Sequence, residues 1–292
     1  MNRTRKAVSH RLAALACFLF SCSFAHADTF YVSNWGDNTI SKIDSSGRTT
    51  LFASTGLHPF AVALDNSGNL YVTDSAGIEK FDSNGSGTLF SSFGGTFFGM
   101  AFGSNGNLYL ADNTYNQVGQ MSSSGQPVPS PVFTVDSPTG LAFDSSGNLY
   151  VAASRNNWIV KISPAGQMSG FARTGLNQPY GLAFDKSGNL YAANAGNNTI
   201  EKFDSSGNGT LFFSTYSSPS GLAFDSSGNL HVVEQRALEM VDPNGHGNFW
   251  PESSFNQPAG IAVQVPEPAT GALLALGLAA LLGIHRLRPH SS

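Results

Sequence analysis

The sequence has little cysteine and little charge. Its two cysteines, Cys17 and Cys22, both lie within the first 27 residues. Removal of that segment would leave no thiol, which excludes disulfides, thiolate metal sites and a cysteine nucleophile. Charged residues make up only 12% of the chain, but 41% of the residues are hydrophobic and 22 are Phe. This apolar content is enough for a large core, so the low charge does not indicate disorder.

Positive charge is especially scarce in the body of the chain. Residues 28–265 contain 18 acidic residues and nine Lys or Arg residues, a formal difference of −9. Nucleic-acid binding depends on basic side chains that neutralise phosphates, so this composition argues against a nucleic-acid partner.

Several catalytic signatures are also missing. Residues 28–265 contain three histidines, His58, His231 and His246, whereas a zinc site needs three or four well-spaced ligands. The chain has no Gly-Lys-Ser/Thr phosphate-binding loop and no nucleophile-elbow motif. These absences favour a function without catalysis.

A twelve-residue string recurs along the chain. GLAFDSSGNLYV occupies residues 140–151, close copies begin at Gly181 and Gly221, and looser copies begin at Ala61 and Gly99, which gives a period near 40. Each copy predicts a short strand, a turn containing Asp and Gly, and a second strand. Two further strands, separated by a second turn, follow each copy. Four short strands in about 40 residues is the spacing of a β-propeller blade.

The two ends of the repeat region predict one shared blade. Residues 257–263 match a first strand that has no successor. The second, third and fourth strands of a blade are predicted at residues 29–33, 39–44 and 49–53, with no first strand before them. Pairing these fragments closes the ring and leaves no exposed edge between them. We therefore expect an all-β, six-bladed β-propeller with four-stranded blades over residues 28–264.

The first 27 residues predict a signal peptide. A basic start precedes an apolar run at residues 12–20, and Ala25 and Ala27 form a small-x-small cleavage site. This apolar run is too short to span a bilayer. We expect cleavage after Ala27, with a lipidated Cys22 as the alternative.

Residues 265–292 have three parts in a specific order. Pro266, Glu267 and Pro268 precede an apolar run at residues 269–284, which predicts a short hydrophobic helix, and an arginine-containing end follows. This order resembles the PEP-CTERM sorting signal of Gram-negative bacteria. The resemblance implies that a membrane-embedded exosortase is a partner, and that it cleaves near the motif and releases the protein towards the outer surface. The helix would span about 24 Å of a hydrocarbon core of about 30 Å, and a permanent membrane anchor is the alternative.

The repeat itself resembles the NHL repeat family. The family's Gly-Asn-Leu-Tyr-Val strand stands at residues 147–151, its Asn-rich loop at 197–200 and its Lys-Phe-Asp strand end at 202–204. The resemblance covers nearly all of residues 28–264. It implies the propeller fold more strongly than any activity, because the family includes both binding modules and enzymes.

Aromatic and arginine residues in two sets of loops predict a binding surface. The loops that lead into the first strands and the loops between the second and third strands are expected to share one mouth of the channel. Trp, Tyr and Arg dominate interface hot spots, and aromatic rings stack on sugars. Packing of each Trp against a neighbouring blade is the alternative. The candidate binding residues are Trp35, Phe60, Tyr115, Arg155, Trp158, Tyr180 and Arg236.

A ring of polar residues directly follows the second strands. Three carboxylates and two amides around a channel could hold Ca²⁺, which takes six to eight oxygen ligands. Propeller lactonases of the gluconolactonase-like kind bind their metal with such residues, although no acidic residue precedes the first strands in this chain. We favour the alternative that these side chains bond backbone amides at the start of each loop, and we expect no cofactor. The candidate metal ligands are Asn34, Asp74, Asp112, Asn194 and Glu234.

The sequence thus predicts a propeller exported through the inner membrane of a Gram-negative bacterium. We expect it at the cell surface or in the extracellular matrix, attached transiently or permanently to the membrane through its C-terminal helix. Its expected function is to bind an extracellular protein or an exopolysaccharide. One alternative is a metal-dependent hydrolase or lyase, gluconolactonase-like or streptogramin-lyase-like, although the latter relies on histidine at the mouth. A passive structural component of the matrix is the other alternative.

Overall fold

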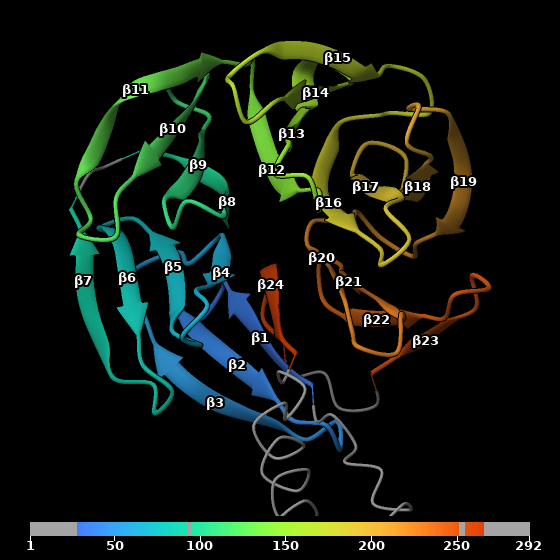
Figure 1. Ribbon diagram of the computed structural model, residues 1–292. Coiled ribbons are helices and arrows are strands. Elements are labelled where there is room, and N and C mark those ends of the chain that lie inside the picture. Colours follow the sequence, from blue (N-terminus) through green and yellow to red (C-terminus); the bar gives the residue numbers. More distant parts are fainter. Residues whose placement is uncertain (1–27, 93–94, 251–254, 266–292) are drawn as a thin grey trace, which may run out of the picture. The chain divides into compact units, whose positions relative to one another are not determined.

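The computed structural model describes residues 28–92, 95–250 and 255–265. Residues Asp28–Val265 form one compact unit, and its described part contains six four-stranded antiparallel sheets. The sheets are arranged as blades around a central channel, with the first strand of each blade innermost and the fourth outermost (Figure 1). The predicted all-β, six-bladed propeller is confirmed. The predicted signal peptide and C-terminal hydrophobic helix lie outside the described residues, and none of the described residues forms a helix long and apolar enough to cross a membrane.

The four strands of each blade follow one another from the channel outwards. Blade 1 contains β24 (Pro258–Gln264), β1 (Thr29–Asn34), β2 (Thr39–Ile43) and β3 (Thr49–Ser54). Blade 2 contains β4 (Val62–Leu64), β5 (Leu70–Asp74), β6 (Gly77–Phe81) and β7 (Gly87–Ser91). Blade 3 contains β8 (Phe97–Phe102), β9 (Leu108–Asp112), β10 (Gln117–Met121) and β11 (Pro127–Thr134). Blade 4 contains β12 (Pro138–Phe143), β13 (Leu149–Ala153), β14 (Trp158–Ile162) and β15 (Met168–Ala172), with a 3₁₀ turn, η1 (Ser154–Asn156), between β13 and β14. Blade 5 contains β16 (Pro179–Phe184), β17 (Leu190–Asn194), β18 (Thr199–Phe203) and β19 (Gly209–Ser214). Blade 6 contains β20 (Leu222–Phe224), β21 (Leu230–Val233), β22 (Leu238–Val241) and β23 (Gly247–Phe249).

The core lies between neighbouring blades, and the repeated aromatic residues form it. Tyr150 of β13 packs edge-on against Phe171 of its own blade and Phe184 of blade 5, at ring-centroid distances of 4.9 and 5.0 Å. Blades 2 and 5 repeat this arrangement around Tyr71 and Tyr191. Such edge-to-face pairs add to the large apolar area that each ring buries. The Tyr and Phe positions of the repeat therefore hold adjacent blades together.

The recurring Asp of the repeat closes the turn between the first and second strands. Asp144 accepts hydrogen bonds at Oδ1 from the backbone N–H groups of Ser146 and Asn148, at 2.9 and 2.8 Å. Its Oδ2 accepts from Asn148 Nδ2 at 2.7 Å and from Tyr150 Oη at 3.3 Å. Partial burial would raise the pKa of Asp144, but these hydrogen bonds outweigh burial and lower the pKa below its ordinary value. The DSSGN string is thus a turn, which is why it recurs.

The N- and C-terminal strands close the ring, as the sequence predicted. β1 pairs antiparallel with β24, with Phe30 opposite Val263 and Val32 opposite Ile261. Blade 1 is therefore built from both ends of the repeat region, and its innermost strand comes from the C-terminal end (Figure 1).

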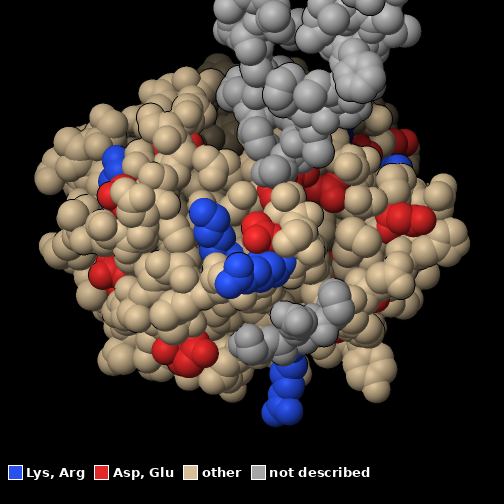
Figure 2. Space-filling model, turned by 90° about the horizontal axis from the view of Figure 1, so that it is seen from below, with Lys and Arg blue, Asp and Glu red and all other residues tan. Residues whose placement is uncertain are grey.

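The face shown in Figure 2 carries few charged side chains, and both signs are scattered among uncharged residues.

Candidate functional site

The two sets of loops share one mouth of the channel. The loop after β1 bonds the loop that leads into β24, through Trp35 N–H to the Gln257 carbonyl at 3.0 Å. The same kind of bond joins Ala195 N–H to the Gln178 carbonyl in blade 5 at 3.2 Å. This mouth therefore gathers loops from all around the ring, which places side chains from distant parts of the sequence together.

Residues with left-handed backbone conformation (positive φ) hold these loops in shape. His58, Gln178 and Gln257, each of which precedes a proline, have φ values of 61°, 47° and 51°. The His58 and Gln178 amides donate to the side-chain oxygens of Asn38 and Asn157, loop residues of the preceding blade, at 2.8 and 2.6 Å. Non-glycine residues seldom adopt this conformation, and it tends to occur at functional sites.

Three aromatic rings meet over the channel axis. Phe60, Phe98 and Tyr180 come from blades 2, 3 and 5, and their ring centroids lie 4.8 to 5.9 Å apart. Below them the channel holds a cavity of only ≈ 90 Å³. Burial raises the pKa of the Tyr180 phenol well above its ordinary value, so this hydroxyl stays protonated and can donate a hydrogen bond. The rings form the floor of the mouth, and a ligand of any size would bind above them.

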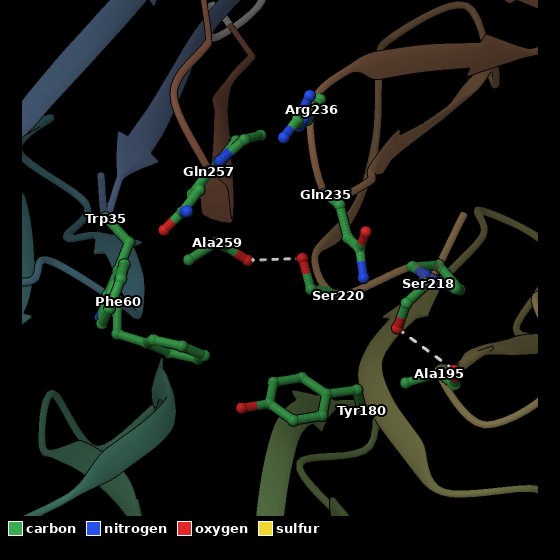
Figure 3. A pocket seen from close by; sticks show the side chains of 12 residues that line it. Trp35, Phe60, Tyr180, Ala195, Ser218, Ser220, Gln235, Arg236, Gln257 and Ala259 are labelled. Carbon is green, nitrogen blue, oxygen red and sulfur yellow. Dashed lines mark hydrogen bonds between the residues drawn. The ribbon is translucent and has the colours of Figure 1, made fainter. Parts of the chain in front are cut away.

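A pocket of ≈ 500 Å³ lies beside this floor (Figure 3). The aromatic side chains of Trp35, Phe60 and Tyr180 line one part of it, and polar side chains of blades 6 and 1, with alanines and prolines among them, line the rest. Two of the polar lining groups are used internally, since Ser218 and Ser220 donate to backbone carbonyls. The other polar lining residues are exposed, and among the described residues their side chains make no hydrogen bond or ion pair. They are Gln235, Arg236 and Gln257.

A second pocket, of ≈ 470 Å³, lies on the other side of Trp35 and Phe60. It is lined by His58, Asp74 and Phe98 among others. The Trp35 ring is 40% exposed and stacks on the His58 ring at 4.4 Å. Trp35 and Phe60 therefore separate two hollows on one mouth and present an aromatic surface to each.

The structure brings together four of the seven candidate binding residues, namely Trp35, Phe60, Tyr180 and Arg236. Tyr115 is exposed and lines neither mouth pocket. Arg155 forms an ion pair with Asp136 at 3.9 Å. The Trp158 ring packs on the blade 4 core, with the Arg173 guanidinium 4.0 Å from its centre, which favours packing for this residue.

Sequence reasoning did not single out Gln235 and Gln257 as pocket residues. Both are exposed and line the larger pocket. The available signal was the position of Gln257 directly before the proline that starts β24. Nothing in the local sequence pattern indicated Gln235. It belongs to blade 6 and reaches the pocket only because ring closure places blade 6 beside blade 1, which carries Trp35.

The five candidate metal ligands are all buried, and each is hydrogen-bonded within its own blade, either to its own loop and the next strand or to the loop that leads into the first strand. Asp74 Oδ1 accepts from the backbone N–H groups of Ala76 and Gly77 at 2.7 and 3.0 Å. Asn194 Oδ1 accepts from Asn177 N–H at 3.1 Å. Asn34 bonds Thr39 and Ser41, Asp112 bonds loop amides, and Glu234 bonds Ser217. In the part of the chain that the structure describes, no three His, Cys, Asp or Glu side chains gather as a metal site would require.

Two pairs of neighbouring carboxyl groups, one buried and one partly buried, adjoin these loops. Burial and the neighbouring Glu234 raise the pKa of Glu239 to about 8. In blade 2, burial raises the pKa of Glu79, and Asp74 adds to the increase. Glu239 therefore keeps its proton near neutral pH. The sequence did not indicate these pairs. Glu79 and Glu239 stand on strands in which buried and exposed side chains are expected to alternate, and a Glu on such a strand is expected to point to solvent.

The Glu234–Glu239 pair should make stability fall as the pH rises. Glu239 holds its proton more tightly in the folded chain, with a pKa of about 8 against an ordinary 4.5. Its stabilising contribution is therefore complete below pH 4.5 and is lost as the pH rises through 8, with a slope of at most about 1.4 kcal/mol per pH unit. Urea unfolding between pH 5 and 9 should show this decline, and Glu239→Gln should flatten it. An unchanged slope in that variant would show that the pKa of Glu239 is not raised in the folded chain.

Comparisons with known proteins agree with this fold. The Virginiamycin B lyase family matches residues 1–240. The PEP-CTERM protein-sorting motif matches residues 264–287, which confirms the signal expected at Pro266, Glu267 and Pro268. This motif marks exported proteins that an exosortase recognises in Gram-negative bacteria. A search of curated proteins found no match.

Several solved structures share the propeller. A catalytically inactive histidine-to-alanine variant of virginiamycin B lyase from Staphylococcus aureus, with quinupristin, has 16% identity and a TM-score of 0.57 over 80% of this chain and 78% of that chain. The nidogen/laminin complex has 18% identity and a TM-score of 0.70 over 81% and 98%. A protein of unknown function from Bacteroides caccae has 13% identity and a TM-score of 0.61 over 82% and 100%. At these identities the likeness is one of fold.

Proposed function

The chain belongs to the virginiamycin B lyase family, and we propose that this member of it is an exported propeller that binds a polysaccharide containing acidic sugars. The observation that supports this function is the ≈ 500 Å³ pocket at the mouth, with aromatic rings on one side and free polar groups on the other. Pockets of this size hold ligands as large as a short oligosaccharide.

The lining chemistry fits a sugar. Trp35 and Phe60 offer ring faces on which the apolar face of a pyranose can stack. The amides of Gln235 and Gln257 can each donate to and accept from hydroxyl groups. Arg236 is the one charged residue of this lining, and its planar guanidinium suits a carboxylate. A chain of neutral and acidic sugars would use all three kinds of group.

Binding is supported over catalysis by the groups at the mouth. General acid–base catalysis needs a titratable group within hydrogen-bond reach of the reacting atom. Among the residues that line the two mouth pockets, His58 stacks on Trp35 and Asp74 accepts hydrogen bonds from its own loop. Tyr180 holds its proton firmly because burial raises its pKa. Asp74 is therefore used within its own loop and Tyr180 keeps its proton, which leaves the His58 ring as the remaining candidate.

Lyase activity is the second candidate, and the family itself favours it. His58 is the one histidine that lines either mouth pocket. Incubation with a streptogramin B antibiotic, with and without a chelator, tests for turnover. Activity that disappears in His58→Ala would support this second candidate.

We further propose how the ends of the chain serve this function. Residues 1–27 are removed as a signal peptide after Ala27, and residues 265–292 act as the sorting segment. The propeller of residues 28–264 then stands at the cell surface or in the extracellular matrix. The PEP-CTERM match over residues 264–287 supports this placement.

Trp35→Ala should weaken binding of both acidic and neutral oligosaccharides at least tenfold, about 1.4 kcal/mol, because it removes the stacking surface. Arg236→Ala should weaken binding of the acidic one alone. Isothermal titration with oligogalacturonate and with maltohexaose measures both effects. Melting temperatures should change little, since Trp35 is 40% exposed and Arg236 is also exposed.

Arg48→Ala is the matched control for Arg236. Arg48 lies in the turn that follows β2, at the opposite end of that strand from the Trp35 loop. Its loss should leave both affinities unchanged. If the wild-type chain binds neither oligosaccharide, or if Trp35→Ala binds as well as wild type, the proposed function is wrong. Capture of a protein partner at this mouth instead would also overturn it.

A further inference from the structure

Blade 3 contains a cavity beside its third strand. It has a volume of ≈ 190 Å³ and shares no lining residue with the ≈ 500 Å³ pocket at the mouth. Its walls come mainly from apolar side chains of β8, β9, β10 and β11, including Phe97, Leu110, Met121 and Val128. Phe97, Leu110 and Met121 belong to the buried cluster that packs against blade 2.

One glycine accounts for this cavity. Gly119 lies opposite Leu110, and the same register position carries Glu79 in blade 2, Glu201 in blade 5 and Glu239 in blade 6. A Cβ atom added at Gly119 would meet no atom within 4 Å. Blade 3 therefore has empty space where three other blades have a carboxylic side chain.

An irregular outer strand walls the space from outside. The pairing of β10 with β11 shifts between Val118 and Gln120, so that Val118 lies opposite Phe133 and Gln120 opposite Val128. The extra residues of β11 bulge out beside Gly119 and include Pro129 and Val132, which line the cavity. Prolines donate no backbone hydrogen bond, which suits a strand that bulges at a sheet edge.

A buried carboxylate lines this otherwise apolar cavity. Asp112 is 3% exposed. Its Oδ1 accepts from the backbone N–H groups of Thr114 and Tyr115 at 3.0 and 3.3 Å. Among the described residues no hydrogen bond or ion pair uses Oδ2. Asp112 thus keeps one oxygen for its loop and leaves the other without a cationic partner, and a ligand that supplies a positive charge beside Oδ2 would stabilise a carboxylate in these apolar surroundings.

From this geometry we propose that the blade 3 cavity is a binding site for a small organic amine. The ammonium group pairs with Asp112 Oδ2, and the hydrocarbon part fills the space above Gly119. An apolar cavity of about 150 Å³ is known to hold benzene, so one of ≈ 190 Å³ fits a six-membered ring with an aminomethyl group. A metal ion suits the cavity less well, because Ca²⁺ needs six to eight oxygen ligands and the walls are mostly apolar.

Benzylamine and benzyl alcohol test the charge requirement, because they have nearly the same shape and differ in charge at neutral pH. Isothermal titration of the full chain at pH 7 should show benzylamine binding at least tenfold more tightly than benzyl alcohol. Benzylamine should also raise the melting temperature. Equal affinities would overturn the proposal, and so would the absence of binding, which would mean that water alone fills the cavity.

Two variants test the site by different means. A Cβ atom fits at Gly119 without a clash, so Gly119→Leu should fill the cavity and abolish benzylamine binding while the chain stays folded. Asp112→Asn keeps the shape of the side chain and should remove the preference for benzylamine over the alcohol. If Asp112→Asn fails to fold because its loop loses a cap, the Gly119→Leu comparison decides alone.

Asp37→Asn is the matched control for the carboxylate. Asp37 is an exposed residue of the loop between β1 and β2, and its replacement should leave benzylamine binding unchanged. Retained binding in Gly119→Leu, or an equal loss in Asp37→Asn, would show that the amine binds the surface nonspecifically. Neither result would bear on the sugar pocket, which is tested with different ligands and variants.

Discussion

A chain of residues 28–250 should fail to unfold cooperatively, whereas a chain of residues 28–265 should melt as the full protein does. The shorter chain lacks β24, which pairs with β1 along the innermost position of blade 1. It also loses Phe255 and Ile261 from the buried cluster that contains Phe30 and Val32. The two missing side chains are worth about 1.5–3 kcal/mol each, and each lost hydrogen bond adds about 1 kcal/mol.

The lost interactions together approach the whole stability of a typical domain, about 5–15 kcal/mol. They also include a contact between blades 6 and 1, because Ser220 Oγ donates to the Ala259 carbonyl at 2.9 Å. A further lost hydrogen bond lies within blade 1, where Gly260 N–H donates to Ser33 Oγ at 2.9 Å. Circular dichroism and calorimetry of the two chains measure the difference. A cooperative transition in the shorter chain would show that the ring does not need to close through β24.

Gly140→Ala should cost about 3 kcal/mol in the free energy of unfolding, a large effect for one methyl group. A Cβ atom at Gly140 would lie 2.1 Å from the Tyr180 carbonyl oxygen and 2.9 Å from the Leu182 nitrogen. Both are backbone atoms of blade 5, so they cannot move aside unless the blades separate. A Cβ atom added at Gly99 or Gly181 would lie equally close to the next blade, 2.0 and 2.2 Å from its carbonyl oxygens.

The matched control for Gly140→Ala lies in blade 2, where Ala61 occupies the equivalent position next to Phe60. A Cβ atom already fits there, and Ala61→Gly should cost only about 0.5–1 kcal/mol, through added freedom of the unfolded chain. Urea unfolding of the two variants measures both costs. A cost below about 1 kcal/mol for Gly140→Ala would show that the blades can separate easily. The close approach also matters for the site, because it is what brings Phe60, Phe98 and Tyr180 together over the channel.

The repeat allowed much of the fold to be predicted. The Asp and Gly of each turn, the alternating strands and the period near 40 are local signals, and they specify the blade. The incomplete blades at the two ends of the repeat region indicated that the ring closes there, because the first strand at residues 257–263 is the strand that residues 29–53 lack. Even the interpretation of Asp144 as a turn residue needed no tertiary information, since its hydrogen bonds all lie within six residues.

The site was predicted less completely, because a repeat specifies position within a blade and not the neighbours across the ring. Trp35 lies in the loop after β1 and faces two pockets, whereas Trp158 is the first residue of β14 and packs under Arg173. Which of them is free depends on side chains of the adjacent blade and on loop length.

The sequence by itself therefore determined the six blades, their turns, the closure through β24 and the sorting signal at the C-terminal end. Only the tertiary structure decided that Trp35, Tyr180 and Arg236 line one pocket, and that Asp112 lines an apolar cavity beside Gly119. The physical reason is the separation along the chain of the residues that interact. Turns and strands follow from interactions between residues a few positions apart, whereas these sites join residues that only ring closure and blade packing bring into contact.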